Sequence, residues 1–468
     1  MNGKEWWARY SNDVHGVGQG HEHYKKMRLN YAKLPEVTLS AFTEAGEPES
    51  SISVLNQRNY TGRDPVIPSS LADTPCICLG VEGLLAKLNT ILGTSYNLEI
   101  HSLSSLLRAY ILKDYDFGTA FSRLRPFWYN DLTDIQDKLH TREVWDRLMR
   151  QDVLVNNKII SRLLPPRRVW DLYSNRVIPW WVARQYPSAI SHAWMDKEDR
   201  MNVQTPINGY EWPAPMPKDA NLDLIRIEML NLGAEYVWLD VLCLRQVSEQ
   251  RDDLHLDEWK LDVPTIGRVY RMAHGRVVCY FSGLGRPLSL KAGDFESDTY
   301  WFRRAWTLQE IQHRMVIGGD TGDDRITEKE MRMRIEIQLS WLRENKSVGG
   351  LGMPVFIALS EMQRRVSTNP VDKVAGLSYL LWTDEIPTYY ILCDAVSRGS
   401  VDGTGRRDKC SSPCGSRGTL EERQCWVVGE RLPGETFKKL SVFMMDNKKE
   451  VKRLHDLGIA TNTKTFLA

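Results

Sequence analysis

The sequence lacks long apolar stretches and lacks an excess of charge of either sign. No run of about eighteen apolar residues occurs in its 468 residues, so no transmembrane helix is expected. The first ten residues carry charges and two Trp but no apolar signal core. The 61 Lys and Arg nearly cancel the 60 Asp and Glu, and a net charge of +1 gives no basis for binding nucleic acid or a membrane surface. We therefore expect a soluble, cytoplasmic protein.

The sequence also has few groups that could cross-link a fold or bind a metal. Its eight Cys residues form no dense framework, which favours a reducing compartment over secretion. Cys410 and Cys414 have no second ligand pair at zinc spacing. The histidines at 15, 21 and 23 have no Cys or carboxylate partner at ligand spacing. We therefore expect no metal site.

The glycine-rich fingerprints of common nucleotide-binding and hydrolase folds are absent. The sequence contains neither the G-x-x-x-x-G-K-[ST] phosphate loop nor G-x-G-x-x-G between a strand and a helix, and it has no G-x-S-x-G nucleophile elbow. Gly283-Leu284-Gly285 follows a predicted strand but lacks a third glycine and a following helix. Classical kinase, P-loop and hydrolase sites are therefore excluded.

The patterns that are present divide the chain into five parts. Residues 1–70 are polar and weakly periodic, and are expected to be disordered. Apolar stripes with helical spacing predict a helical module over 71–165, which ends at a Pro-Pro pair. We expect an α/β domain over 166–345, a helical extension over 346–390 and a low-order tail over 391–468.

Short apolar strands alternate with helical stretches within 166–345. Strands are predicted at 189–194, 236–244, 277–281 and 315–317, and helices at 222–230, 259–272, 301–311 and 327–341. Strands separated by helices form βαβ units, so we expect an α/β fold with a mainly parallel sheet flanked by helices. The unbroken apolar character of 236–244 predicts a central strand that is covered on both faces.

Polar side chains lie at the predicted strand ends, where ligands bind in parallel α/β sheets. The candidates on strands and their ends are Ser191, His192, Trp194, Asp196, Asp240, Arg245 and Gln246. On the predicted helix at 301–311, Arg303, Trp306 and Glu310 are spaced i, i+3, i+7 and therefore share a face. The sequence predicts a site built from strand ends and one polar helix face.

Each candidate also has a purely structural interpretation. His192 fits a hydrogen-bonded structural histidine, and Asp240 fits a buried acid satisfied by backbone N–H groups or by an arginine. Glu310 fits an ion pair with an arginine at a helix surface. Core packing accounts equally well for the aromatic residues Trp194, Trp238 and Trp306. Residue types alone leave both interpretations open.

Five blocks of this sequence together resemble the fungal heterokaryon incompatibility (HET) domain, in the order found in that family. The blocks are Ala189–Trp194, Tyr236–Gln246, Val269-Tyr270, Trp301–Ile311 and Asp372–Leu377. The sequence departs from the family pattern where Arg245 replaces the usual Asn and Leu239 the usual Ile. In the first block, His192 replaces the usual Tyr and Met195 the usual Gly. The segments around Trp170–Tyr173 and Trp212–Asn221 resemble the version found in mushroom-type fungi, the basidiomycetes.

The HET resemblance implies a TIR-like, flavodoxin-like fold. Some TIR domains cleave NAD with a glutamate in a helix that reads roughly Trp-Cys-x-x-Glu-Leu, and Trp306–Ile311 is similar to that pattern. The resemblance therefore implies Glu310 as a catalytic residue and NAD as a substrate, with no bound cofactor. It further implies nucleotide contacts from Ser191, Trp194, Asp240, Arg245, Gln246 and Trp306.

Three functions follow from the resemblance and stay open on the sequence. The first is a role in non-self recognition and programmed cell death, which implies self-association and partners among other incompatibility or signalling proteins, not nucleic acid. The second is cleavage of NAD, which is an effector mechanism for the first. The third is a scaffold without catalytic activity.

Overall fold

The computed structural model describes most of the chain up to residue 387. The described residues are 5, 17–248, 252–273, 276–289, 291–322, 329–346, 355–367, 369–380 and 386–387. The predicted tail over 391–468 and the start of the helix predicted at 327–341 lie outside them.

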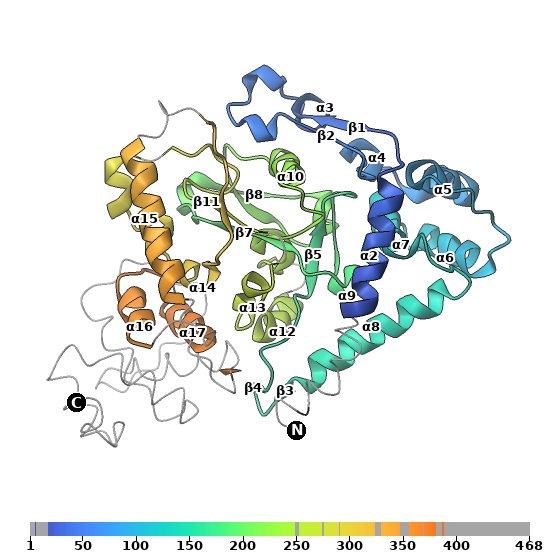
Figure 1. Cartoon of the computed structure of the whole chain (residues 1–468). Coiled ribbons are helices and arrows are strands. Elements are labelled where there is room, and N and C mark those ends of the chain that lie inside the picture. Colours follow the sequence, from blue (N-terminus) through green and yellow to red (C-terminus); the bar gives the residue numbers. More distant parts are fainter. Residues whose placement is uncertain are drawn as a thin grey trace, which may run out of the picture.

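A six-stranded sheet lies at the centre of the molecule, in the order β12-β11-β7-β10-β5-β6 (Figure 1). Its strands are β5 (Arg168–Asp171), β6 (Arg176–Pro179), β7 (Ser188–His192), β10 (Tyr236–Trp238), β11 (Val277–Tyr280) and β12 (Met315–Ile317). The pairs β7–β10, β7–β11 and β11–β12 are parallel, whereas β5 pairs antiparallel with β10 and with β6. The predicted α/β fold with a mainly parallel sheet flanked by helices is confirmed.

Helices cover both faces of this sheet. On one face lies α10 (Leu222–Asn231), and on the other lie α12 (Asp252–Asp262), α13 (Ile266–Arg271) and α14 (Thr307–Glu310) (Figure 1). The Tyr280 hydroxyl of β11 donates to Glu228 of α10 at 2.7 Å, and the ring of Tyr270 in α13 meets that of Trp238 in β10. The helical stretch expected over 259–272, with a kink or a start at Pro264, forms two helices separated at Pro264, which has no N–H to continue the helical bonds.

Strand β10 is central, as predicted, but it is much shorter than the predicted 236–244. It lies between β7 and β5, and all three of its residues are buried. After Leu239 the chain turns into the short helix α11 (Asp240–Cys243). The carboxylate of Asp240 accepts from the N–H of Val241 at 2.7 Å, so this acid bonds the first turn instead of extending the strand. A buried helical turn and a buried strand have the same apolar composition, which explains the error.

The segment 301–311 differs most from its prediction. It contains one turn of 3-10 helix (Trp301–Arg303), an extended residue at Arg304 and the one-turn helix α14. Backbone bonds between this segment and Val366 interrupt the helix, with Ala305 N–H donating to Val366 at 2.9 Å and Val366 N–H donating to Arg303 at 2.5 Å. Arg303, Trp306 and Glu310 therefore do not share a helix face.

The antiparallel hairpin β5–β6 is absent from the sequence-based assignment. Each strand has only four residues, too few for a pattern to emerge. Asn175 makes the turn between them with a φ of 55°, a left-handed conformation that asparagine tolerates. The hairpin extends the sheet beyond β10, so β10 is not an edge strand.

Residues 17–70 are ordered in the structure, which contradicts the expectation of disorder for this part of 1–70. They form α2 (Val17–Tyr31), the antiparallel pair β1 (Val37–Ser40) and β2 (Asn59–Gly62), and the short helices α3 (Ala41–Ala45) and α4 (Ser69–Ala72). Met27, Tyr31, Leu39 and Ile67 are buried within the main core. The apolar residues that anchor this segment are widely spaced in a polar sequence, so its average composition resembles that of disordered chains.

Helices and short strands surround the α/β part on its other sides. The segment predicted to be helical contains α5 (Cys76–Leu92), α6 (His101–Leu112), α7 (Phe117–Leu124) and α8 (Ile135–Asp152), followed by β3 (Leu154–Val155) and β4 (Lys158–Ile159). The later elements are α15 (Lys329–Lys346), α16 (Val355–Gln363), α17 (Pro370–Leu380) and β13 (Ile386–Pro387), and β13 pairs with β4. A further hairpin joins β8 (Arg200–Val203) to β9 (Ala214–Pro217).

A buried arginine joins the N-terminal elements to the sheet. Arg125, just after α7, is fully buried and donates to Glu235 at 2.5 Å and to Asp171 at 3.0 Å. It also donates to the hydroxyls of Tyr31 at 3.0 Å and Tyr236 at 2.9 Å. These partners come from α2, β5 and the start of β10, so one charge connects three parts of the chain.

We predict that Arg125→Met lowers the free energy of unfolding by about 3–5 kcal/mol, because it leaves two buried carboxylates without their cation. Urea denaturation of the full chain measures the change.

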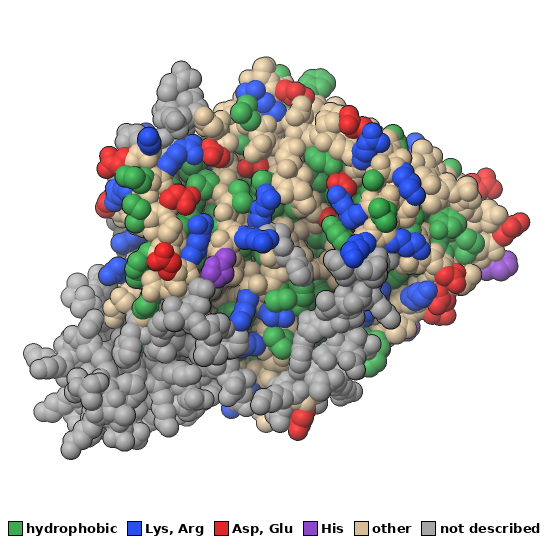
Figure 2. Space-filling model, in the orientation of Figure 1, with side chains coloured by type: hydrophobic (Ala, Val, Ile, Leu, Met, Phe, Trp, Pro, Cys, Tyr) green, Lys and Arg blue, Asp and Glu red, His purple; other side chains and the backbone are tan. Residues whose placement is uncertain are grey.

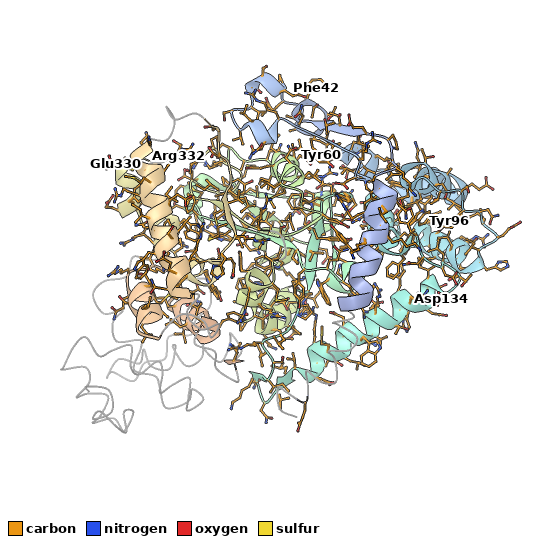
Figure 3. All side chains as sticks on the ribbon, viewed as in Figure 1. Phe42, Tyr60, Tyr96, Asp134, Glu330 and Arg332 are labelled. Carbon is orange, nitrogen blue, oxygen red and sulfur yellow. The ribbon has the colours of Figure 1, made fainter. Side chains whose placement is uncertain are left out.

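The matched control is Lys138→Met. Lys138 pairs with Asp134 at the exposed start of α8 (Figure 3), with side-chain exposures of 41% and 52%, so its loss should cost less than about 1 kcal/mol. Equal effects of the two substitutions would show that the buried cluster does not join the two parts.

Candidate functional site

The candidate site lies at the carboxyl end of β7. The next strand of this sheet in sequence, β10, pairs on one side of β7, and β11 pairs on the other. The end of such a strand is the usual ligand position in an open α/β sheet. Ser191 and His192 are the last residues of β7, and because they are consecutive, their side chains point to opposite faces of the sheet.

On one face, Ser191 contacts the carboxylate of Glu310. The Ser191 hydroxyl donates to Glu310 Oε2 and accepts from Trp301 Nε1 at 2.7 Å. Ser191 is fully buried, and Glu310 is only 8% exposed. Glu310 is the last residue of α14, so the break in the predicted 301–311 helix is what brings this carboxylate to the strand end. The alternative interpretation of Glu310 as a surface ion pair is wrong.

On the other face, His192 contacts Asp240. His192 Nε2 lies 2.9 Å from Asp240 Oδ1, and Trp194 Nε1 donates to Asp240 Oδ2 at 3.0 Å. The rings of His192 and Trp194 stack with centroids 5.4 Å apart. With the Val241 N–H on Oδ1 as well, the Asp240 carboxylate is held by a histidine, an indole and the backbone.

The two acids have opposite pKa shifts. Burial raises the pKa of Glu310 to about 7, and the negative charge of Asp240 raises it further, against the Ser191 hydrogen bond and the charges of His192 and Arg365. For Asp240, burial alone would raise the pKa, but the charge and hydrogen bond of His192 outweigh it, so the pKa is lowered. Burial lowers the pKa of His192, but the negative charge and the hydrogen bond of Asp240 outweigh burial, so the pKa is raised overall. Near neutral pH we therefore expect an ionised Asp240–His192 pair beside a half-protonated Glu310.

Arg365 holds the segment that carries Glu310. It follows α16, is 1% exposed, and donates to the carbonyl of Arg304 at 2.9 Å and to the hydroxyl of Thr307 at 2.7 Å. Burial lowers the pKa of Arg365 to about 10, against the opposing charges of Glu361 and Glu310. The helical extension is therefore part of the site's support.

The other predicted site residues lie away from the Glu310 carboxylate. Arg245 donates to Glu211 at 2.5 Å and lies 4.9 Å from the ring centroid of Trp212. Gln246 donates to the carbonyls of Asp240 at 3.3 Å and Leu244 at 3.0 Å. Trp306 packs, partly buried, against the core. Ser191, Trp194, Asp240 and Glu310 gather around the end of β7. Arg245, Gln246 and Trp306 do not contact the Glu310 carboxylate.

Sequence reasoning misses two residues that shape the site and leaves the role of a third open. His192 lies at the end of the strand predicted at 189–194, where the sequence allows a functional or a structural role; in the structure it is the main partner of Asp240. Trp301 is not among the predicted site residues, yet its indole N–H donates to the Ser191 hydroxyl. Arg365 gave no local signal because its role depends on contacts with a distant segment. A strand end that reads Ser-His-x-Trp is the one pattern that indicated His192.

The described residues contain no cluster suited to a metal. No group of three or more His, Cys, Asp or Glu side chains in that part of the chain is arranged to hold a metal ion.

No helix among the described residues combines the length and apolar character needed to cross a bilayer.

Comparison with known proteins identifies one family. Residues 188–287 match the family model described as Heterokaryon incompatibility protein (HET). The matched region includes β7, β10 and β11, and ends before Glu310. It supports a heterokaryon incompatibility domain in this chain, as the resemblance implied. No curated protein and no solved structure matches the chain.

We predict that protonation of Glu310 makes the fold more stable at low pH. Its pKa rises from 4.5 to about 7 on folding, so this stabilisation is complete below pH 4.5 and is lost as the pH rises through 7. Between pH 5 and 8, the wild type should lose about 2–3 kcal/mol relative to Glu310→Gln, which cannot ionise. Urea unfolding of both proteins across this range measures the difference. A constant difference would mean that Glu310 titrates normally.

We further predict that Arg365→Gln raises the pH midpoint of this effect, because the charge of Arg365 lowers the pKa of Glu310. The substitution should also destabilise the fold by about 1–3 kcal/mol through lost hydrogen bonds. The same pH series, with and without Glu310→Gln, measures both changes. Arg364→Gln is the control, since that side chain is 74% exposed. A shift of equal size in both variants would contradict a specific role for Arg365.

Proposed function

We propose that this chain is a heterokaryon incompatibility protein of the HET domain type, which acts in non-self recognition and in the cell-death signalling that follows. The support is the family match over 188–287, together with the resemblance of later blocks up to Leu377. The segments Trp170–Tyr173 and Trp212–Asn221 support a basidiomycete-type member. By the same resemblance, we propose a cytoplasmic location, self-association and partners among other incompatibility or signalling proteins.

A second candidate function is hydrolysis of NAD by a TIR-like mechanism. The observation that favours it is the Glu310 carboxylate at the end of β7, at the point where the strand order reverses. Water would replace nicotinamide at C1′ of the ribose: the C–N bond breaks, its electron pair leaves with nicotinamide, and the water oxygen bonds C1′ with release of a proton. A carboxylate beside the ribose stabilises the oxocarbenium-like transition state of such a reaction.

This chemistry requires the Glu310 carboxylate to become accessible. In the structure it is 8% exposed and bonded to Ser191, so a substrate must displace that hydroxyl. The same burial favours the third candidate, a scaffold in which Glu310 has only a structural role. A fragment limited to 160–345 would not distinguish them, because it lacks Arg125 and Arg365.

We predict that Glu310→Gln in the full chain abolishes cell killing on overexpression and NAD consumption, because it keeps the shape of the side chain and removes its charge. Thermal melting at pH 6 should show a folded protein. Glu336→Gln on α15 is the control, since that side chain is 56% exposed and should leave all three measurements unchanged.

The outcomes separate the three candidates. Killing that persists in a folded Glu310→Gln protein would remove Glu310 from the mechanism. If the wild type kills cells without consuming NAD, the proposed NAD hydrolysis is contradicted and the proposed signalling role remains. Loss of killing together with a collapsed melt would assign Glu310 a structural role.

A further inference from the structure

A cavity lies beside the start of α10, away from the end of β7. Its volume is about 350 Å³, which is in the size range of small-molecule sites. Its walls come from α3, α4, β8, β9 and the turn of the β5–β6 hairpin, and α3, α4 and α10 lie together in the upper part of Figure 1. Of the described residues that gather around the end of β7, Ser191, Trp194, Asp240 and Glu310, none lines this cavity. The cavity is therefore separate from the candidate site.

The lining of this cavity is part apolar and part polar. Ile207 and Met216 are buried and belong to its apolar part. The polar part includes Ser69, Asn175 and the carboxylate of Asp223, the second residue of α10. Apolar lining with a few convergent polar groups is typical of a site that binds a small organic molecule.

The Asp223 carboxylate has few hydrogen-bond partners. Asn175 Nδ2 donates to Asp223 Oδ1 at 3.0 Å. The Ser69 hydroxyl lies 3.1 Å from the same oxygen but 2.5 Å from Glu44 Oε2, and a hydroxyl donates only one hydrogen bond. Because the shorter contact is with Glu44, Asn175 is the donor left to Asp223. Among the described residues, Asp223 Oδ2 accepts no hydrogen bond.

Asp223 also has no ion pair within the described part of the chain, unlike the other acids of the cavity. Glu44 pairs with the buried Arg226 at 3.0 Å. Asp73 pairs with Arg176 at 2.5 Å. Burial raises the pKa of Asp223 against the charge of Arg226, and the negative charge of Glu44 raises it further. A cation beside Oδ2 would therefore stabilise the ionised form of this acid.

We propose that this cavity binds a protonated amine on a short apolar stem, with the ammonium group at Asp223 Oδ2 and the stem against Ile207 and Met216. An ammonium group supplies both the charge and the N–H donors that this carboxylate lacks. An anion would be repelled by Asp223, and a neutral ligand would leave the acid without a cation. No group of side chains in the described residues is arranged to hold a metal ion, so the cation is an organic one.

Recognition of the amine depends on the cavity itself. The net charge of the chain is +1, and Figure 2 shows basic, acidic and apolar side chains interspersed over one face of the molecule. Neither feature attracts cations to the protein from a distance. Free alkylamines and the lysine side chains of peptides share the apolar stem and the ammonium group, so both are sources of the ligand. The proposal does not rest on the function proposed above.

Saturation-transfer NMR titrations of the full chain with pentylamine, pentanol and pentanoate test the proposal at neutral pH. Pentylamine should bind at least about tenfold more tightly than pentanol, which has the stem without the charge. Pentanoate should bind most weakly, because its carboxylate would meet that of Asp223. N-acetyl-lysine methylamide distinguishes the sources. Tighter binding of this probe than of pentylamine would identify a peptide lysine as the ligand, and weaker binding a free amine; both support the site.

Removal of one charge tests the role of Asp223. Asp223→Asn should weaken pentylamine binding at least about tenfold, because it removes the charge and keeps an oxygen for Asn175. Asp219→Asn is the matched control. Asp219 lies in the same segment, pairs with Arg286 at 2.9 Å and is 59% exposed, so its loss should change amine binding less than about twofold. Thermal melting shows whether each variant is folded.

An exposed residue of the lining allows a test that leaves the hydrogen bonds of the cavity intact. Gln204→Lys places a tethered ammonium group beside the cavity, so it should compete with pentylamine and weaken its binding. Gln204→Met has a stem without a charge and should leave pentylamine binding unchanged.

Three results would overturn the proposal: equal binding of pentylamine and pentanol to the wild type, unchanged amine binding in a folded Asp223→Asn protein, or equal losses in Asp223→Asn and Asp219→Asn. If Asp223→Asn does not fold, the two Gln204 variants decide. Equal pentylamine binding by Gln204→Lys and Gln204→Met would then contradict an amine site in this cavity.

Discussion

The four partners of the Arg125 guanidinium impose the constraint on which the rest of the structure depends. Removal of this charge from water is costly, and only the simultaneous approach of Glu235, Asp171 and two tyrosine hydroxyls compensates for it. The buried carboxylates of Asp171 in β5 and of Glu235 beside β10 therefore have their cation only when the N-terminal elements have docked. Consequently, the start of β10, within the HET-matched region at 188–287, is held by an arginine from outside the match.

At the end of β7, alternation along a strand creates two different chemical environments within two residues. Ser191 faces an acid that burial keeps largely protonated up to neutral pH, and His192 faces an acid that stays ionised. Acids with pKa values pushed apart are typical of sites that divide chemical roles between similar groups. Here the division follows from local surroundings: Glu310 has a serine and a buried position, whereas Asp240 has a histidine, an indole and a backbone N–H.

The sequence predicts those parts of this fold that local patterns encode. The apolar strands β7, β10, β11 and β12 and the proximity of Ser191 to Glu310 follow from strand periodicity and from the rule that sites lie at carboxyl ends. The break in 301–311 depends on backbone bonds to Val366, and the support of Glu310 depends on Arg365, so both need contacts that no local window contains. The order of 17–70 likewise comes from scattered apolar residues that meet only in the folded core.

The pairing of β13 with β4 has a consequence for how the chain assembles during synthesis. Ile386 pairs with Ile159, so the edge presented by β4 stays unfilled until the ribosome has released the whole intervening α/β region. Contacts this distant in sequence form late and slowly. Among the described residues, β13 therefore closes an edge of β4 that a chain ending before Ile386 would leave unpaired.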